Sequence, residues 1–189
     1  MNAIMSKISP SATNMIRMDH THVLAAFHQY ALDSRPQTKQ GLVNGICLAL
    51  EIHAQLEEEI FYPAMESVQG GVLEKEVPEH DQMRRFIAQL RSMEPTDGGY
   101  DNTFMELMRT VIHHVADEET MLLPAAERLM PERLGELGTQ MTKRRFQLAA
   151  PRAGELIGNT VRAMPASTML MGAGALLAGS LLLRQAFRR

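Results

Sequence analysis

The sequence predicts an all-α protein: an antiparallel, up-down four-helix bundle followed by a C-terminal extension that ends in an apolar helix. Two observations support this. In four segments of the first 130 residues, apolar side chains recur with the 3.6-residue period of an amphipathic helix. Short stretches of turn-forming residues separate these segments, and long helices joined by short loops are typical of antiparallel bundles.

Turn residues set the expected limits of each helix. The first helix covers about 13–32 and the second follows the Ser-Arg-Pro turn at 34–36 and continues to about 66. After the Gln-Gly-Gly break at 69–71, the third helix begins near Pro78, and the loop at 94–99 separates it from the fourth, at about 102–123. The apolar side chains expected inside are Ile16, Val23, Leu24, Phe27 and Ala31; Val43, Ile46, Leu50, Ile60 and Phe61; Val77, Met83, Ile87 and Leu90; and Phe104, Leu107, Met108, Val111, Val115 and Leu122.

The chain divides into three parts by composition. Residues 12–130 are the expected bundle, and 131–162 form a helical and linker extension. Within it, the stretch PERLGELGTQMTKRRFQ predicts a fifth helix, and the proline- and glycine-containing APRAGELIGNTVRAMPAS predicts a connector. Residues 163–189 form an apolar C-terminal helix and candidate membrane anchor.

Composition excludes several classes of function. A formal net charge of -3 and an aromatic content of 5%, without tryptophan, give no reason to expect a nucleic-acid partner. Cys47 is the only cysteine, so neither an intrachain disulfide nor a cysteine-based metal site is expected. The first 18 residues lack an apolar stretch of signal-peptide length, so we expect a cytoplasmic protein.

An internal repeat carries the chemistry of this sequence. HAQLEEEIFYP at 53–63 and HVADEETMLLP at 114–124 share the pattern His-x-x-x-Glu-Glu, with a proline ten positions after the histidine. Upstream, DHTHVLAAF at 19–27 matches EHDQMRRFI at 79–87, so each half of the bundle is a helical hairpin of the same design. Each hairpin supplies one histidine from its first helix and a His-x-x-x-Glu pair from its second.

Helical geometry places these polar residues on the buried faces. Residues four apart lie on the same side of a helix, so His53 points with Glu57 and His114 with Glu118. The apolar stripe of the second helix passes through His53 and Glu57 to Phe61. The stripe of the fourth passes through His114 and Glu118 to Met121. The first and third helices carry a histidine on the same face as their apolar residues, and the six inward residues are His20, His53, Glu57, His80, His114 and Glu118.

Two bound metal ions would offset the cost of burying two carboxylates and four imidazoles. Each ion takes two histidine nitrogens, and Glu57 and Glu118 bridge the pair. Imidazole with carboxylate suits iron, with manganese and zinc as alternatives. We therefore expect two non-haem iron ions joined by an oxo or hydroxo bridge.

Several neighbouring polar residues compete with this set. His113 diverges from Glu118 around the helix unless a π-bulge intervenes, and the proline register also selects His114. Glu58, Glu59 and Glu119 lie outside the stripe and are expected either on the surface, with solvation as their main role, or as partners of the metal ligands.

The combined pattern resembles the hemerythrin family, in particular the bacterial hemerythrin-like (HHE cation-binding) domains, over about residues 12–130. The resemblance implies a four-helix bundle around a non-haem di-iron centre. Ferritin-like proteins would instead have Glu-x-x-His, the reverse order with a different spacing. Oxygen-carrying hemerythrins have a further histidine where this chain has Arg84, and they end in His-x-x-x-x-Asp. Both departures disfavour reversible oxygen carriage.

The four-histidine, two-glutamate set is similar to the di-iron domain of repair-of-iron-centres proteins, which are linked to nitric oxide and iron–sulfur damage. This similarity implies a protein that binds or reacts with O2, NO or H2O2 in oxidative or nitrosative stress defence. The alternative is a non-catalytic oxygen or redox sensor, or an iron-storage module, that reports through its C-terminal segment. Arg84 is either a partner of a metal-bridging carboxylate or an arginine with its head in water.

The C-terminal run from Ala163 to Leu183 is uncharged, although Pro165 shortens the usable helix to about 18 residues, the lower end for a membrane span. We expect it to anchor a cytoplasmic domain to the inner membrane. Small residues at positions 168, 172, 175 and 179 form a stripe, so the alternative is a helix buried in a homo-oligomer interface.

Overall fold

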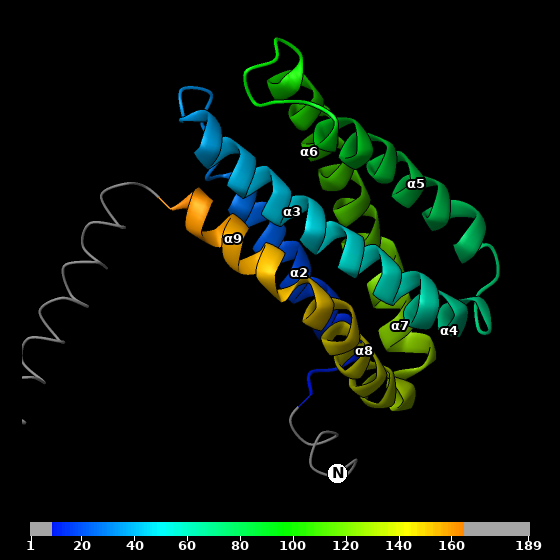
Figure 1. Ribbon diagram of the computed structural model, residues 1–189. Helices are drawn as coiled ribbons and strands as arrows, with labels where there is room; N and C mark the ends of the chain where they lie inside the picture. Colours follow the sequence, from blue (N-terminus) through cyan, green and yellow to red (C-terminus); the bar gives the residue numbers. More distant parts are fainter. Residues whose placement is uncertain (1–8, 165–189) are drawn as a thin grey trace, which may run out of the picture.

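The computed structural model describes residues 9–164, and every regular element within that range is a helix. Helix α2 (Ala12–Phe27) precedes a long continuous segment made of α3 (Pro36–Leu56), a π-helical stretch (Glu57–Phe61) and α4 (Tyr62–Glu66). Helix α5 (Val72–Arg91) precedes a second such segment made of α6 (Tyr100–Asp117), a π-helical stretch (Glu118–Leu122) and α7 (Leu123–Leu129). These segments lie side by side (Figure 1).

The two π-helical stretches occupy equivalent places in the two hairpins, at the end of each His-x-x-x-Glu motif. Each begins at the glutamate of its motif, Glu57 or Glu118. A π-helical turn changes the register of the side chains that follow it. Met121, expected inside, is therefore 63% exposed, whereas Leu122 is buried.

Helix α5 begins six residues earlier than the sequence predicts. The carboxylate of Glu66 accepts hydrogen bonds from the backbone N–H groups of Gly71, Val72 and Leu73, which satisfies donors that a helix start leaves free. Gly71 has φ 85°, a left-handed conformation that glycine adopts without strain. Pro78 therefore lies inside the helix. Val77 is only half-buried, and Glu76 takes the buried position beside it.

The first helix ends at Phe27, and Ala31 lies beyond it as an exposed residue, which corrects the predicted end near residue 32. The extension confirms the fifth helix, as α8 (Leu134–Ala149), between short 3₁₀ turns at Pro131–Arg133 and Ala150–Arg152. The predicted connector is wrong, because its residues form α9 (Ala153–Ala163).

Helix α9 packs along α3 (Figure 1), and glycine makes this contact close. A Cβ atom added at Gly41 would come within 2.6 Å of the Cβ of Arg162 and 2.7 Å of the backbone nitrogen of Ala163. The two backbones can approach only because that atom is missing. Gly41 lies within the second helix that the sequence predicts, and in the structure it belongs to a helix–helix interface.

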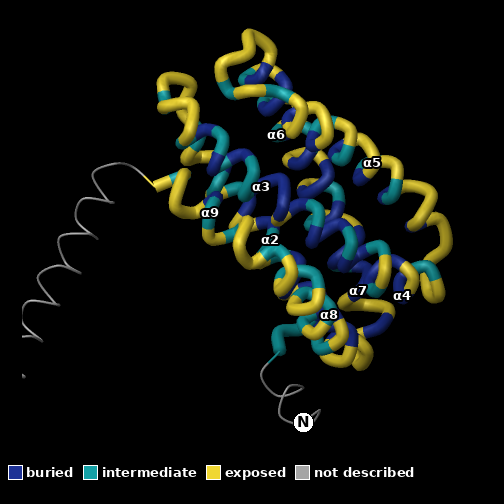
Figure 2. Tube along the Cα trace, viewed as in Figure 1, coloured by how far each residue is buried: buried dark blue, intermediate teal, exposed yellow. Residues whose placement is uncertain are grey.

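The buried apolar side chains form two clusters at opposite ends of the bundle. Figure 2 shows buried stretches alternating with exposed ones along the helices. One contains Ile16, Leu56 and Phe61, and the other contains Val23 and Leu50 among others. His20 lies in sequence between Ile16 and Val23, so the polar residues occupy the layer between the two clusters.

Among residues 9–164, no helix is long and apolar enough to span a membrane. The expected apolar C-terminal helix falls almost entirely on 165–189, outside the described residues, and stays a prediction.

Candidate metal centre

All six residues selected from the repeat lie together in the middle of the bundle. Their exposed fractions range from 0% for Glu57, His80 and Glu118 to 7% for His53. They come from four different helical segments and form two overlapping groups whose nitrogen and oxygen atoms could hold a metal ion. The first group is His20, His53, Glu57 and Glu118, and the second is Glu57, His80 and His114.

The histidines form two pairs, one from each hairpin. The ring centroids of His20 and His53 are 5.1 Å apart, and those of His80 and His114 are 4.8 Å apart. Between the pairs, the ring of His53 is 6.5 Å from those of His80 and His114. The sequence repeat therefore corresponds to two neighbouring half-sites.

Each glutamate lies next to two histidines, one from each pair. Oε2 of Glu57 is 3.1 Å from Nε2 of His53 and 3.3 Å from Nε2 of His80. Oε2 of Glu118 is 3.2 Å from Nε2 of His20 and 3.6 Å from Nε2 of His114. Both carboxylates thus lie between the two half-sites. His113 is exposed and takes no part.

The family to which this arrangement belongs is decided by the sequence. The family model described as the hemerythrin HHE cation-binding domain matches residues 11–126, more than half of the chain. This chain belongs to the hemerythrin HHE cation-binding family. It is accordingly a metal-binding protein, and the matched residues contain all six inward side chains of the hemerythrin domain.

A solved structure supports the hemerythrin fold. The crystal structure of a hemerythrin HHE cation-binding domain-containing protein from Mycobacterium kansasii superposes with a TM-score of 0.67, at 20% identity, over 82% of this chain and 99% of that one. A curated relative from Nostoc sp. named a DNA nickase is 27% identical over 147 residues. The match covers 77% of this chain but only 42% of the relative.

In the hemerythrin domain, the Nδ1 atom of each inward histidine faces a carboxylate. His20 pairs with Glu119 at 2.9 Å and His53 with Asp19 at 3.3 Å. His80 pairs with Glu58 at 2.9 Å and His114 with Glu79 at 2.9 Å. A carboxylate at Nδ1 fixes the proton there and leaves the Nε2 lone pair free for a metal ion. Glu58 and Glu119 therefore take the second of their two expected roles, as partners of the metal ligands, and solvation is not their main role.

Arginines hold three of these four carboxylates. Arg145 on α8 binds both oxygens of Asp19, and Arg17 on α2 donates to Glu119 at 3.2 Å. Arg84 donates to Glu58 at 2.7 Å, so it supports a histidine-orienting carboxylate rather than a bridging one. Neither expectation for Arg84 described this role. The fifth helix thus contributes to the site from outside the bundle.

Tyr62 is a site residue that the sequence reasoning missed. Its side chain is fully buried. Its hydroxyl is 2.9 Å from Oε1 of Glu118, 3.3 Å from Oε2 of Glu57 and 3.2 Å from Nε2 of His80. The repeat conceals it, because the equivalent position before the second proline is Leu123. Comparing the repeats for differences rather than similarities would have identified it.

Burial sets the protonation of the site in the protein without metal. Burial raises the pKa of Glu57 well above its usual range, and the neighbouring charge of Glu118 adds to this effect. For Glu118 burial acts the same way, but contact with His20 and the charges of nearby histidines hold its pKa below its usual range. Burial lowers the pKa of His53 to about 4. Of the two buried carboxylates, Glu57 therefore binds a proton more readily than Glu118 does.

The donor atoms also fit a metal on geometric grounds. Among the described residues, Nε2 of His20, Oε1 of Glu57 and Oε2 of Glu118 are buried without a hydrogen-bond partner. Buried polar atoms normally have partners, and lone pairs that converge without donors are what a cation would satisfy. The residues present in this hemerythrin domain therefore fit a bound cation.

Proposed function

We propose that the chain holds two metal ions, His20 and His53 binding one and His80 and His114 binding the other. Glu57 and Glu118 are shared between the two ions. The observation that carries this proposal is that each glutamate contacts one histidine of both pairs at 3.1–3.6 Å. A mononuclear site would not require carboxylates between two separate histidine pairs.

The donor set favours iron. Four imidazoles with two carboxylates suit iron, and manganese and zinc are the alternatives. When bound, a pair of irons supplies the capacity to bind and exchange electrons with a small oxygen- or nitrogen-containing ligand. Cys47, the only thiol in the sequence, is buried, and burial raises its pKa to about 12, so thiolate chemistry is not available at neutral pH.

The protein's own residues set the conditions for that chemistry. The carboxylates at Nδ1 orient the four rings, and their arginine partners hold them in place. The Tyr62 hydroxyl holds a proton 2.9 Å from Oε1 of Glu118, at the residues that would hold the two metal ions. The apolar clusters pack against the centre from both ends.

We propose that the function is to bind or react with O2, NO or H2O2 in oxidative or nitrosative stress defence. The symmetric two-histidine half-sites support reaction over reversible oxygen carriage. The alternative is a non-catalytic sensor or iron store built on the same centre. Consumption of H2O2 or NO by the purified protein, absent from the metal-free protein, separates the first function from the second.

Metal content and absorption spectra test the centre itself. We expect two irons per chain and charge-transfer bands in air that disappear on reduction. The double variant Glu57→Ala, Glu118→Ala should lose both metals, whereas the exposed Glu132→Ala should keep them. Stoichiometric zinc in protein from iron-rich cultures would contradict the iron assignment, and retention of both irons by the double variant would contradict the bridging role.

A further inference from the structure

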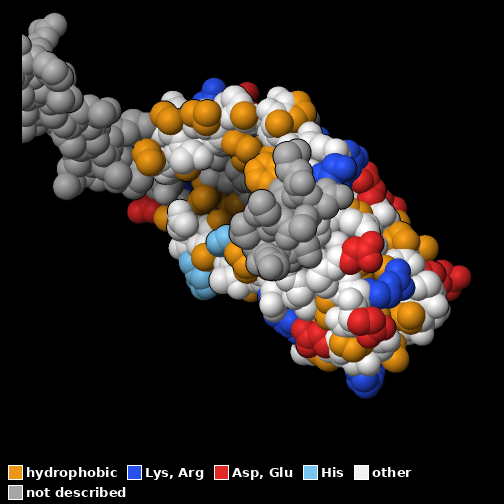
Figure 3. All heavy atoms as spheres, turned by 90° about the horizontal axis from the view of Figure 1, so that it is seen from below, with side chains coloured by type: hydrophobic (Ala, Val, Ile, Leu, Met, Phe, Trp, Pro, Cys, Tyr) orange, Lys and Arg blue, Asp and Glu red, His pale blue; other side chains and the backbone are white. Residues whose placement is uncertain are grey.

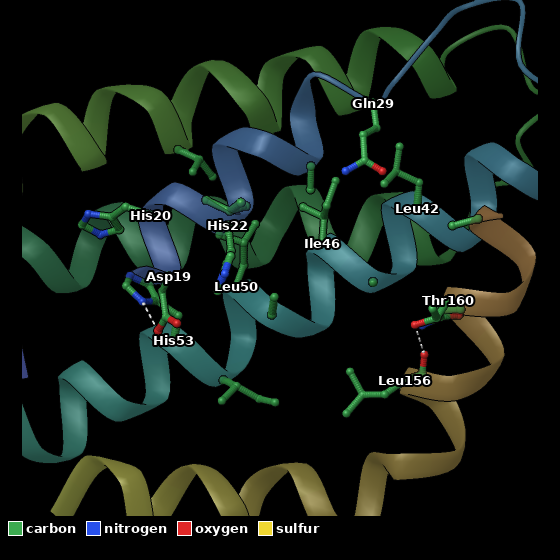
Figure 4. Close-up of a pocket in the computed structure, with 18 of the residues that line it drawn as sticks. Asp19, His20, His22, Gln29, Leu42, Ile46, Leu50, His53, Leu156 and Thr160 are labelled. Atoms are coloured by element: carbon green, nitrogen blue, oxygen red, sulfur yellow. Dashed lines mark hydrogen bonds and ion pairs between the residues drawn. The ribbon is translucent and has the colours of Figure 1, made fainter. Parts of the chain in front are cut away.

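A cavity of about 560 Å³ extends from the metal centre along the groove between α2, α3 and α9. Figure 3 shows a hollow on this face of the molecule with hydrophobic side chains inside it. Figure 4 shows His20, His53 and Asp19 at one end and Gln29, Leu42 and Thr160 at the other. His114 also contributes to the wall at the metal end.

The cavity is far larger than a diatomic gas or peroxide requires. One water-sized molecule occupies about 30 Å³ in the liquid. Leu42 and His53 both line the cavity and are eleven residues apart on α3, which corresponds to about 17 Å at 1.5 Å per residue. Its volume falls in the range of sites for small organic ligands.

Most of the cavity wall is apolar. Val23 from α2, Ile46 and Leu50 from α3, Val111 from α6 and Leu156 from α9 line its length. These side chains present no hydrogen-bonding groups, so they suit an unbranched hydrocarbon rather than a polar metabolite.

An unpaired donor lies at the end away from the metal centre. Asn159 lines the cavity and is 3% exposed. Its Nδ2 atom has no hydrogen-bond partner among the described residues. A buried amide donor without a partner is costly, and a ligand oxygen in the cavity would supply the acceptor.

We propose that this cavity binds a medium- or long-chain fatty acid. Its carboxylate accepts a hydrogen bond from Nδ2 of Asn159, and its hydrocarbon runs past Ile46 and Leu50 towards His53. The site does not require the metal centre, so it stands independently of the proposed di-metal function. It adds an organic ligand whose far end lies beside the metal-binding histidines.

Titration calorimetry of the full-length protein, with its metal content recorded, tests this inference. Dodecanoate should bind at one site per chain, whereas butyrate, which is too short to fill the cavity, should bind at least about 100-fold more weakly. Asn159→Leu, which keeps the volume but removes the donor, should weaken dodecanoate binding about tenfold. Glu132→Ala, at an exposed position that does not line the cavity, should bind dodecanoate as the parent does.

A filling variant locates the ligand. Ala49 lines the middle of the cavity, and Ala49→Phe should abolish dodecanoate binding. Ala88→Phe, at an exposed position of α5 that does not line it, should leave binding unchanged. Thermal unfolding of both variants verifies their fold. Absence of dodecanoate binding would overturn the inference, leaving the cavity to a gas or to the chain's own apolar residues 165–183. Equal binding by the parent and Ala49→Phe would also overturn it.

Discussion

Oε1 of Glu58 lies 2.9 Å from Nδ1 of His80, and this contact joins the two hairpins of the bundle. Glu58 follows the inward Glu57 in sequence, and Glu119 follows Glu118 and supports His20 in the same way. The other two carboxylates precede a histidine and support the partner helix of their own hairpin. Four of the six inward residues, namely His20, Glu57, His80 and Glu118, thus have a sequence neighbour that orients a histidine of another helix. This explains why the repeat includes an acidic residue before His20 and before His80, and a second glutamate after Glu57 and after Glu118.

Removing the Glu58 carboxylate should weaken metal binding without disrupting the fold. Glu58→Gln deprives His80 Nδ1 of its charged acceptor, and loss of such an orienting group lowers metal affinity by about 10–100-fold. Glu119→Gln should act similarly through His20. Competition titration with a chelator measures the affinity, and Glu59→Gln, at a residue that pairs with Arg144 on the surface, is the matched control. Equal affinities in all three variants would show that these carboxylates are only structural.

The Tyr62 hydroxyl should control reactivity more than metal content. Tyr62→Phe keeps the ring and its packing but removes the proton nearest Glu118. We expect both metals to be retained and the rate of H2O2 or NO consumption to fall about tenfold or more, because proton transfer at the site is lost. Tyr100→Phe, at a buried tyrosine in the apolar cluster away from the centre, is the control. Full activity of Tyr62→Phe would show that the Tyr62 hydroxyl takes no part in the reaction.

The sequence predicted the inward residues because two independent periods agree on them. The 3.6-residue apolar period and the duplicated His-x-x-x-Glu spacing both select His53 with Glu57 and His114 with Glu118. What it failed to predict depends on contacts between helices. When its own helix is considered alone, Glu58 is expected to face solvent. His80 and Arg84, which contact it, belong to the neighbouring helix α5.

Local sequence rules predict the wrong structure wherever tertiary contacts override them. Pro78 marks a helix start in isolation, but the Glu66 carboxylate satisfies an earlier start at Val72. Met121 fits the α-helical stripe, but the π-helical stretch turns it to solvent. Gly154 and Gly158 predict a connector, yet the residues around them form α9, which packs against α3 at Gly41.

Close packing between α8 and the start of α2 should depend on Gly138. A Cβ atom there would lie 2.1 Å from the carbonyl oxygen of Pro10 and 2.9 Å from the nitrogen of Ala12, both backbone atoms. Gly138→Ala should lower the free energy of unfolding by about 1–3 kcal/mol, the usual cost of overpacking. Gly135→Ala, in the same helix with nothing within 4 Å of the added atom, should not be destabilising. Urea unfolding followed by circular dichroism compares them, and equal stabilities would contradict this packing.

The relative named a DNA nickase makes DNA cleavage a necessary test. A net charge of -3 and the low aromatic content predict that this chain does not bind or nick DNA. Incubation of iron-loaded protein with supercoiled plasmid, at low salt and with a reductant, should give no open-circular product above that of free iron. Nicking that is lost in the Glu57→Ala, Glu118→Ala variant would overturn the prediction and assign the activity to the centre.

Acid should weaken the metal-free protein in part through Asp19. Although burial opposes its ionisation, hydrogen bonds from His53 and Arg145 hold the pKa of Asp19 at about 2, against an ordinary value of 3.8. A lowered folded-state pKa stabilises the protein above the unfolded-state pKa, and that contribution is lost as the pH falls from about 4 towards 2. The shift corresponds to about 2 kcal/mol near neutral pH.

Asp19→Asn should therefore be less stable than the parent at pH 6, and the difference should narrow below pH 4. Urea unfolding at both pH values measures it, with the exposed Asp33→Asn as control. A difference that stays constant with pH would show that packing, rather than the charge of Asp19, supplies its stabilisation.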